Sequence, residues 1–315
     1  MTDNCALALK IDVDTLKGYR EGLPRLLDML KRRGIRASIF FSMGPDNSGK
    51  AVRRIFRRGF VSKMLRTRAP STYGLKTLLY GTLLPAPMIV ESDPGLLRRA
   101  VDEGHDCGVH AWDHVFWQDR LPSLSREAVR EQFARSMELF ERVSGTAPAC
   151  CAAPGWQTTP DALAVQDELG FAYCSDVRGT GPSLPRVFLP RMGGTTFRTP
   201  QIPSTLPTLD ELWGTDGLDA DTVNDRYLDL LEPGVNVHTI HTEMEGGAMS
   251  GVFEALLDAC LEGEMAFMTL REVLAGAGAA ATVDDGAAPL PVSEVVMREI
   301  PGRAGTLAVQ QAAEG

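Results

Sequence analysis

The sequence lacks most of the features that would place a protein in a specialised structural class. It has no window of ~18 uncharged apolar residues, which argues against a transmembrane helix. Residues 1–14 have no basic region followed by an apolar core, so we expect no signal peptide. Its six cysteines include no C-x-x-C pair, which predicts reduced thiols and neither a disulfide framework nor a zinc ribbon. With 315 residues and no internal repeat, one large domain or two small ones are expected.

Positive charge is scarce outside one stretch of the chain. The net charge is −9, which does not favour nucleic acid as a partner. Residues 47–90 nevertheless contain nine Lys or Arg and no Asp or Glu, so the rest of the chain carries −18 against the +9 of this stretch. Apolar residues within it follow helical spacing, and the opposite side is basic, with Arg53, Arg54, Arg57 and Arg58. Such a helix, followed by an apolar and aromatic segment, is typical of binding to an anionic membrane surface; a solvated basic face or a site for an acidic partner is the alternative.

Short apolar runs alternate with amphipathic stretches along most of the chain. Strands are expected at 5–11, 37–41, 149–153, 171–175, 235–240 and 266–268. Helices are expected at 23–33, 93–103, 124–143, 159–170, 223–231 and 252–261. This alternation predicts an α/β fold, either a β/α barrel or a doubly wound sheet.

The chain divides into three parts by composition. Residues 1–274 form the predicted catalytic domain, with residues 47–90 as an insertion that faces a membrane. Residues 275–288 are mostly Ala and Gly and predict a flexible linker. Residues 289–315 regain a strand-like pattern and are expected to pack back on the domain.

Two aspartates stand at the end of the first predicted strand. Side chains alternate along a strand, so Asp12 and Asp14 should face the same side. Two neighbouring carboxylates repel each other unless a proton or a cation lies between them. The alternative is that one of them caps the following turn, which would explain one aspartate but not both.

Two histidines, His110 and His114, lie four residues apart in Gly-Val-His-Ala-Trp-Asp-His. On a helix this spacing would place both imidazoles on one face, where they could hold a divalent metal. The alternative is that one histidine caps a helix and the other packs. One carboxylate and two histidines suit Zn²⁺, Mn²⁺, Co²⁺ or Ni²⁺ and leave positions open for water and substrate.

The remaining polar groups at strand ends could move protons. The second aspartate could accept a proton from water, and His241, at the end of a later strand, could protonate a leaving amine. His238 is a rival for that role, and we favour His241, which stands at the end of the predicted strand.

At this point four motifs resemble those of the polysaccharide deacetylases, carbohydrate esterase family four. They are Asp12-Val13-Asp14, His110-x-x-x-His114, Ala153-Pro154-Gly155-Trp156 and Ile240-His241. The resemblance implies a metal-dependent amide hydrolase on a distorted β/α barrel. The Thr-Pro-Gln-Ile-Pro run at 199–203 and the basic insertion are similar to those of members that remove a formyl group from a sugar carried on undecaprenyl phosphate.

The resemblance also implies residue roles. Asp14, His110 and His114 would bind the metal, Asp12 would be the base and His241 the acid. The substrate side would consist of Trp112, Pro154, Gly155 and Trp156. Two departures from the family pattern matter: Val13 separates aspartates that are usually adjacent, and Ala152 stands where many members carry an arginine that orients the base.

For the cell, the resemblance implies a peripheral enzyme on the cytoplasmic face of the bacterial inner membrane. Its product would be the free amine that later masks lipid A phosphates and gives resistance to polymyxin and other cationic antimicrobial peptides. Two other functions stay open at this point. One is a cytosolic deacetylase of the same superfamily with a soluble sugar or peptide substrate, and the other is a non-catalytic membrane-surface module with a structural metal.

Overall fold

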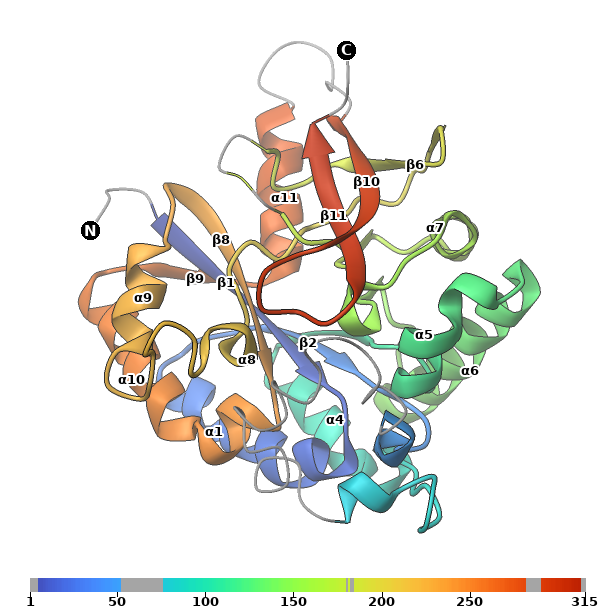
Figure 1. Cartoon of the computed structure of the whole chain (residues 1–315), viewed down its shortest axis with the longest axis horizontal. Coiled ribbons are helices and arrows are strands. Elements are labelled where there is room, and N and C mark those ends of the chain that lie inside the picture. The colour runs from blue at the N-terminus through green and yellow to red at the C-terminus, as the bar shows by residue number, and fades with distance from the viewer. Residues whose placement is uncertain (1–4, 52–75, 180, 182–183, 282–289, 313–315) are drawn as a thin grey trace.

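A curled parallel sheet of seven strands forms the centre of the protein (Figure 1). The computed structural model describes residues 5–51, 76–179, 181, 184–281 and 290–312. The strands of this sheet are β1 (Cys5–Val13), β2 (Ser38–Phe41), β3 (Asp106–Val109), β4 (Cys150–Cys151), β5 (Tyr173–Cys174), β8 (Gly234–His241) and β9 (Ala266–Met268). Their order is β5-β4-β3-β2-β1-β8, and β9 pairs with the first half of β1. The predicted distorted β/α barrel is confirmed.

Helices follow most of these strands, as a parallel sheet requires. They are α1 (Leu23–Arg32), α4 (Pro94–Asp102), α5 (His114–Arg120), α6 (Arg126–Ser144), α7 (Pro160–Leu169), α8 (Leu209–Leu212), α9 (Val223–Asp229), α10 (Ser250–Glu262) and α11 (Leu270–Ala281). Single turns of 3₁₀ or π helix lie at Gly18–Gly22, Thr77–Leu79, Val90–Ser92, Leu121–Ser123, Pro154–Trp156 and Met244–Ala248. The expected ends of α7 are confirmed: Thr159 accepts the Ala162 N–H, and Gly170 is left-handed.

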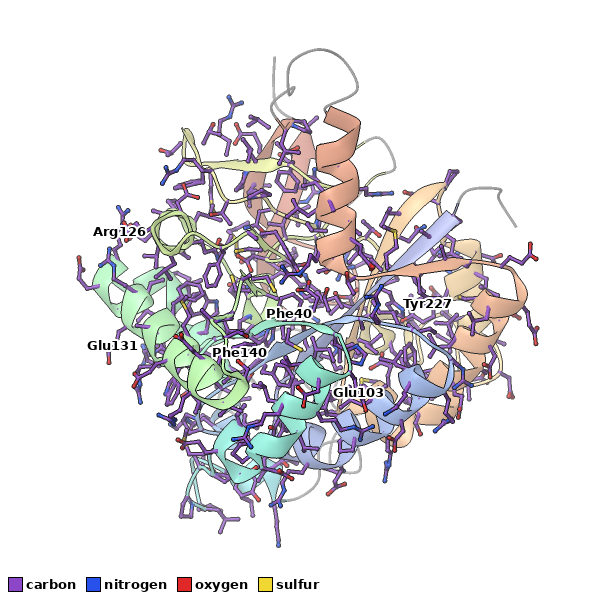
Figure 2. All side chains as sticks on the ribbon, turned by 180° about the vertical axis from the view of Figure 1, so that it is seen from behind. Phe40, Glu103, Arg126, Glu131, Phe140 and Tyr227 are labelled. Atoms are coloured by element: carbon purple, nitrogen blue, oxygen red, sulfur yellow. The ribbon has the colours of Figure 1, made fainter. Side chains whose placement is uncertain are left out.

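The two faces of β1 are buried against different parts of the chain. Leu7, Leu9 and Ile11 face outward into the core that the helices form. Ala8 faces inward and packs in a second cluster with Phe40 and Val237. Figure 2 shows Phe40 near the middle of the molecule, whereas the exposed Glu131 lies at the edge, on α6. Residues of even number on β1 therefore point into the barrel, and those of odd number point towards the helices.

The barrel is completed on one side by an irregular segment. Within the described chain, β5 and β8 do not pair with each other. The segment 199–206 lies between them: Ile202 N–H donates to the Cys174 carbonyl at 2.9 Å, and Thr205 N–H donates to the Val237 carbonyl at 3.0 Å. The Thr-Pro-Gln-Ile-Pro run thus connects the two edges, and its prolines, which lack an N–H, explain why it is not a regular strand.

The C-terminal part of the chain covers the inner face of the sheet. A second sheet has the order β11-β10-β6-β7, with β6 (Leu189–Met192), β7 (Thr195–Thr196), β10 (Val292–Glu299) and β11 (Thr306–Ala312). β10 lies parallel to β6, so residues 292–299 pack back on the domain. The prediction of a linker from residue 275 is wrong for residues 275–281, which continue α11. Alanine is the strongest helix former, and Leu270 and Val273 anchor this helix in the inner cluster.

The insertion is described only at its two ends. Arg53, Arg54, Arg57 and Arg58 lie outside the described residues. Its described C-terminal end, residues 76–90, carries three exposed leucines, Leu79, Leu83 and Leu84, of which Leu83 is 80% exposed. Among the described residues, no helix combines the length and the apolar character needed to cross a bilayer.

Candidate metal centre and active site

The predicted site residues lie at the carboxyl ends of three parallel strands. Asp12 is the second-last residue of β1, and Asp14 directly follows the strand. His110 directly follows β3, and His241 is the last residue of β8. The carboxyl ends of parallel strands meet at one edge of the sheet, which is where α/β folds place their sites.

A sharp turn, and not a helix face, brings the two histidines together. His110 precedes α5 and His114 is its first residue, so the predicted one-face helical arrangement is wrong. Between them, Ala111 takes a left-handed conformation with φ 76°. Asp113 then caps α5 by accepting the Phe116 N–H at 2.9 Å. The imidazole centroids end up 5.4 Å apart. A non-glycine residue held in this backbone region is a feature of functional sites.

Asp14 lies between the two histidines. Its Oδ1 is 3.3 Å from His110 Nε2, and its Oδ2 is 3.3 Å from His114 Nε2. One donor atom from each of the three residues lies within 4.8 Å of the others. One carboxylate and two imidazoles are a donor set for Zn²⁺, Mn²⁺, Co²⁺ or Ni²⁺ that leaves coordination positions open. These residues therefore fit a divalent metal ion.

The electrostatics of the site also favour a cation. Burial alone raises the pKa of Asp14, but His114 and His110 outweigh burial and hold this pKa well below its ordinary value. Burial alone lowers the pKa of His110, but Asp12 and Asp14 outweigh burial and raise it. The two carboxylates are thus stabilised by a positive charge between them. A divalent metal could supply that charge, so that His110 need not carry a proton.

Asp12 stands beside this group without being part of it. Its Oδ2 is 3.9 Å from His110 Nε2 and 3.4 Å from the Nζ of Lys10. Its Oδ1 is buried and has no hydrogen-bond partner among the described residues. Of the two aspartates, only Asp14 contacts both histidines. The geometry thus separates a carboxylate that contacts both histidines from one that lies beside them.

His241 reaches the site from the neighbouring strand. It is the register partner of Asp12 across β1 and β8, so both side chains project on the inner side. Its backbone N–H donates to Glu245 Oε2 at 2.9 Å. His238 lies on the other face of β8, with its ring 4.5 Å from that of Tyr227. Burial lowers the pKa of His238 to about 3, aided by Arg178, so this histidine is a neutral core residue.

The expected substrate-side residues lie in different local surroundings. Pro154 and Gly155 form a 3₁₀ turn in which Gly155 has φ 59° and passes so close to Gln118 that a Cβ would lie 2.3 Å from its Nε2. Trp112 packs beneath Arg135 of α6, whose guanidinium carbon is 4.3 Å from the ring centroid. The Trp112 ring is thus packed against Arg135 of α6.

Trp156 is buried and lies among cations. Its Nε1 donates to Ser204 Oγ at 3.0 Å. Three cationic groups surround the ring, namely Lys10 at 5.2 Å, Arg178 at 4.8 Å and Arg303 at 4.7 Å from its centroid. Through Lys10, this tryptophan is linked to Asp12.

Three ionisable residues near the site were missed from the sequence. Glu243 Oε1 accepts the N–H and the hydroxyl of Thr15 at 2.9 and 2.6 Å, and burial, then Asp14, raises its pKa to about 8. Burial likewise raises the pKa of Glu245 to about 8. Lys10 is fully buried. A lone charge inside the apolar run Cys-Ala-Leu-Ala-Leu-Lys-Ile was the signal that could have identified it.

The basic insertion begins next to the metal centre. Asp46 Oδ2 accepts the Leu16 N–H at 2.9 Å, two residues from Asp14. Asn47 Nδ2 donates to Asp113 Oδ2 at 2.6 Å, and Asp113 is the cap of the helix that starts with His114. Residues 46 and 47 are thereby attached to both sides of the site.

Comparison with known proteins agrees with this geometry. The polysaccharide deacetylase family model matches residues 11–174, a span that includes both aspartates and both histidines. The chain belongs to the polysaccharide deacetylase family. A relative from Shewanella sediminis is 37% identical over 96% of this chain and 94% of its own length, and is named "Probable 4-deoxy-4-formamido-L-arabinose-phosphoundecaprenol deformylase ArnD". A relative of the same name from Wigglesworthia glossinidia brevipalpis is 29% identical over 93% of this chain and 98% of its own length.

The same fold is found in solved structures. A Mycobacterium smegmatis protein, provisionally described as a polysaccharide deacetylase, superposes with a TM-score of 0.59 over 92% of this chain and 94% of that one. Its sequence is 13% identical, so the likeness concerns the fold. This likeness and the family match confirm the predicted fold class. The prediction of a hydrolase is confirmed by the family match and the Shewanella sediminis relative.

Proposed function

We propose that this protein is a metal-dependent deformylase whose substrate is 4-deoxy-4-formamido-L-arabinose-phosphoundecaprenol. The observation that carries the proposal is the grouping of Asp14, His110 and His114 within 4.8 Å, with Asp12 beside it. The substrate class follows the name of the Shewanella sediminis relative, which matches almost the whole chain. The products are the free 4-amino sugar lipid and formate, in a step towards lipid A modification and resistance to cationic antimicrobial peptides.

In the proposed mechanism, Asp14, His110 and His114 hold the metal. Bound there, a divalent cation supplies positive charge that acidifies water and polarises the acyl oxygen. Asp12 Oδ1 accepts a proton from the water whose oxygen bonds to the formyl carbon. His241 then donates a proton to the sugar nitrogen as the carbon–nitrogen bond breaks, and formate leaves. One water is consumed for each amine and formate produced.

We further propose that the insertion meets the membrane and the lipid phosphate. The cations of residues 47–90 suit an anionic bilayer at roughly 1 kcal/mol each. Leu83, which is 80% exposed, offers an apolar anchor at the C-terminal end of the insertion. The attachment of Asn47 to Asp113 places the start of the insertion next to the site. This arrangement supports a peripheral protein on the cytoplasmic face of the inner membrane that draws a lipid-linked sugar to the metal.

Mass spectrometry of the sugar lipid, before and after incubation with metal-loaded protein, tests the activity. We expect loss of one formyl group and release of formate. An unchanged lipid, combined with turnover of a water-soluble N-acyl sugar, would favour a deacetylase with soluble substrates instead. A chelator that unfolds the chain, with no turnover of either substrate, would favour a non-catalytic module with a structural metal.

Co-sedimentation with vesicles tests the membrane part separately. Leu83→Ser should weaken binding to vesicles that contain anionic lipid, and it should change the free energy of unfolding by no more than about 0.5 kcal/mol because the side chain is exposed. The matched control is Leu261→Ser, an exposed leucine on α10. Equal vesicle binding by both variants would contradict the membrane role of Leu83.

A further inference from the structure

Lys10 is a buried lysine in the middle of β1, and the function proposed above leaves it without a role. Its side chain is 0% exposed. Long charged side chains are almost never fully buried unless they are paired, because removing the ammonium from water is unfavourable. A residue in this situation requires a reason that apolar packing does not supply.

The groups in contact with the ammonium stabilise a positive charge. Lys10 Nζ donates to the Ser175 carbonyl at 3.1 Å and lies 3.4 Å from Asp12 Oδ2. The Phe40 and Trp156 rings lie with their centroids 5.9 and 5.2 Å away. Carbonyl, carboxylate and two aromatic rings form a built site for a cation. The position of Nζ is therefore determined by four elements of the fold.

Strand geometry explains why this cation meets the carboxylate of Asp12. Residues two apart on a strand project on the same side, so Lys10 and Asp12 both point into the barrel. The Lys10 ammonium lies 3.4 Å from Oδ2, while Oδ1 has no hydrogen-bond partner among the described residues. One oxygen is thus held and the other is left for chemistry.

We infer that Lys10 is the positioning residue for the general base, which it holds by one carboxylate oxygen so that Oδ1 of Asp12 faces the reacting water. This inference rests on the proposed function, since it takes Asp12 as the base. It also provides a cation in a chain that has Ala152, a small buried residue of the same inner cluster, at the position where the resemblance leads one to expect an arginine.

Three substitutions at this position test the inference. Lys10→Met keeps the length and removes the charge, and we expect kcat to fall roughly 100-fold. KM and the metal content, measured by mass spectrometry of the bound ion, should stay close to wild type. Lys10→Arg keeps a cation and should restore kcat to within about tenfold of wild type. Lys10→Gln keeps an N–H donor without the charge and serves in place of the methionine variant if that variant does not fold.

Thr239→Val is the matched control. Thr239 is the register partner of Lys10 on β8, is equally buried and bonds to Ser204 without contacting Asp12 in any described interaction. We expect this variant to lose some thermal stability and to keep kcat. A merely structural role for Lys10 predicts that Lys10→Met and Thr239→Val lose kcat equally, in step with their Tm. That result would overturn the inference, as would an Lys10→Arg variant no better than Lys10→Met.

A crystallographic comparison separates this inference from the proposed substrate. In Lys10→Met the Asp12 carboxylate should rotate away from its wild-type orientation, and in Lys10→Arg it should keep that orientation. An unmoved carboxylate in Lys10→Met would overturn the positioning role, whatever the substrate is. If the wild-type protein turns over neither the lipid-linked formamide nor a soluble N-formyl glycoside, the proposed function fails, and the orientation of Asp12 still decides the contact with Lys10.

Discussion

The two faces of β1 differ in almost every physical respect, although they alternate residue by residue. The outer face presents Leu7, Leu9 and Ile11 to the helices, all at most 1% exposed. The inner face presents Ala8, then Lys10, then Asp12, so it changes from small and apolar to charged as the strand approaches its carboxyl end. One strand of nine residues therefore supports the core on one side and the chemistry on the other.

This difference teaches where stability and function lie in this fold. On the outer face, burial of apolar area is the stabilising term, at roughly 25 cal/mol per Å². On the inner face, charged groups are held without water, which costs stability but makes their electrostatic interactions stronger. Substitutions on the two faces should therefore separate loss of stability from loss of activity.

The largest expected effect is on the inner side, at the metal centre. His110→Ala removes one imidazole from the group around Asp14, so we expect loss of bound metal together with a fall in kcat/KM of about 1000-fold or more. His114→Ala should behave in the same way. Metal content by elemental mass spectrometry and turnover are measured on the same samples. Activity that survives without metal would contradict the assignment.

The next effect separates the two aspartates. Asp12→Asn leaves the group of Asp14 and the two histidines in place, so metal should be retained while kcat falls by roughly 100- to 10,000-fold. Asp14→Asn serves as the matched comparison and should lose metal. If the Asp12 variant is the one that loses metal, the roles of the two carboxylates are exchanged.

On the outer face, the expected effect is on stability and not on chemistry. Leu9→Ala leaves a cavity in the core between β1 and the helices, so the free energy of unfolding should fall by about 2–5 kcal/mol. Because Leu9 points away from the site, kcat per folded molecule should not change. Urea unfolding and activity at low temperature check both parts. A kcat that falls well below the folded fraction would show that the two faces are coupled.

The smallest effect is on the pH dependence of stability. It concerns the buried Glu245, whose carboxyl group accepts the backbone N–H of His241. Burial raises the pKa of Glu245 to about 8 in the folded protein, whereas the unfolded chain releases this proton near the ordinary value of 4.5. The folded state therefore binds more protons between these values, and the free energy of unfolding contributed by this group falls as pH rises from 4.5 to about 8. A glutamine does not titrate, so Glu245→Gln should gain stability over wild type on going from pH 5 to pH 8. Urea unfolding curves that keep a constant difference at the two pH values would refute this.

Much of the architecture followed from local patterns in the chain. The apolar run of β1, the amphipathic α1, and the Thr159 and Gly170 ends of α7 were predictable because each depends on residues a few positions apart. The Asp12–Asp14 pair was recognisable because a strand repeats every two residues. The Ala-rich residues 275–281 were predicted to be a linker but continue helix α11. Their composition did not distinguish linker from helix, and packing of α11 against the inner cluster decides it.

The sequence by itself determined the strand–helix alternation, the polar strand ends and the donor types of a metal site, because these depend on residue chemistry and short-range periodicity. Only the tertiary structure decided that a left-handed turn at Ala111 brings His110 and His114 together, that Asp14 lies between them, and that Lys10 holds Asp12. These contacts join strands that are far apart in the chain, and their distances depend on how the sheet curls. No local pattern carries that information.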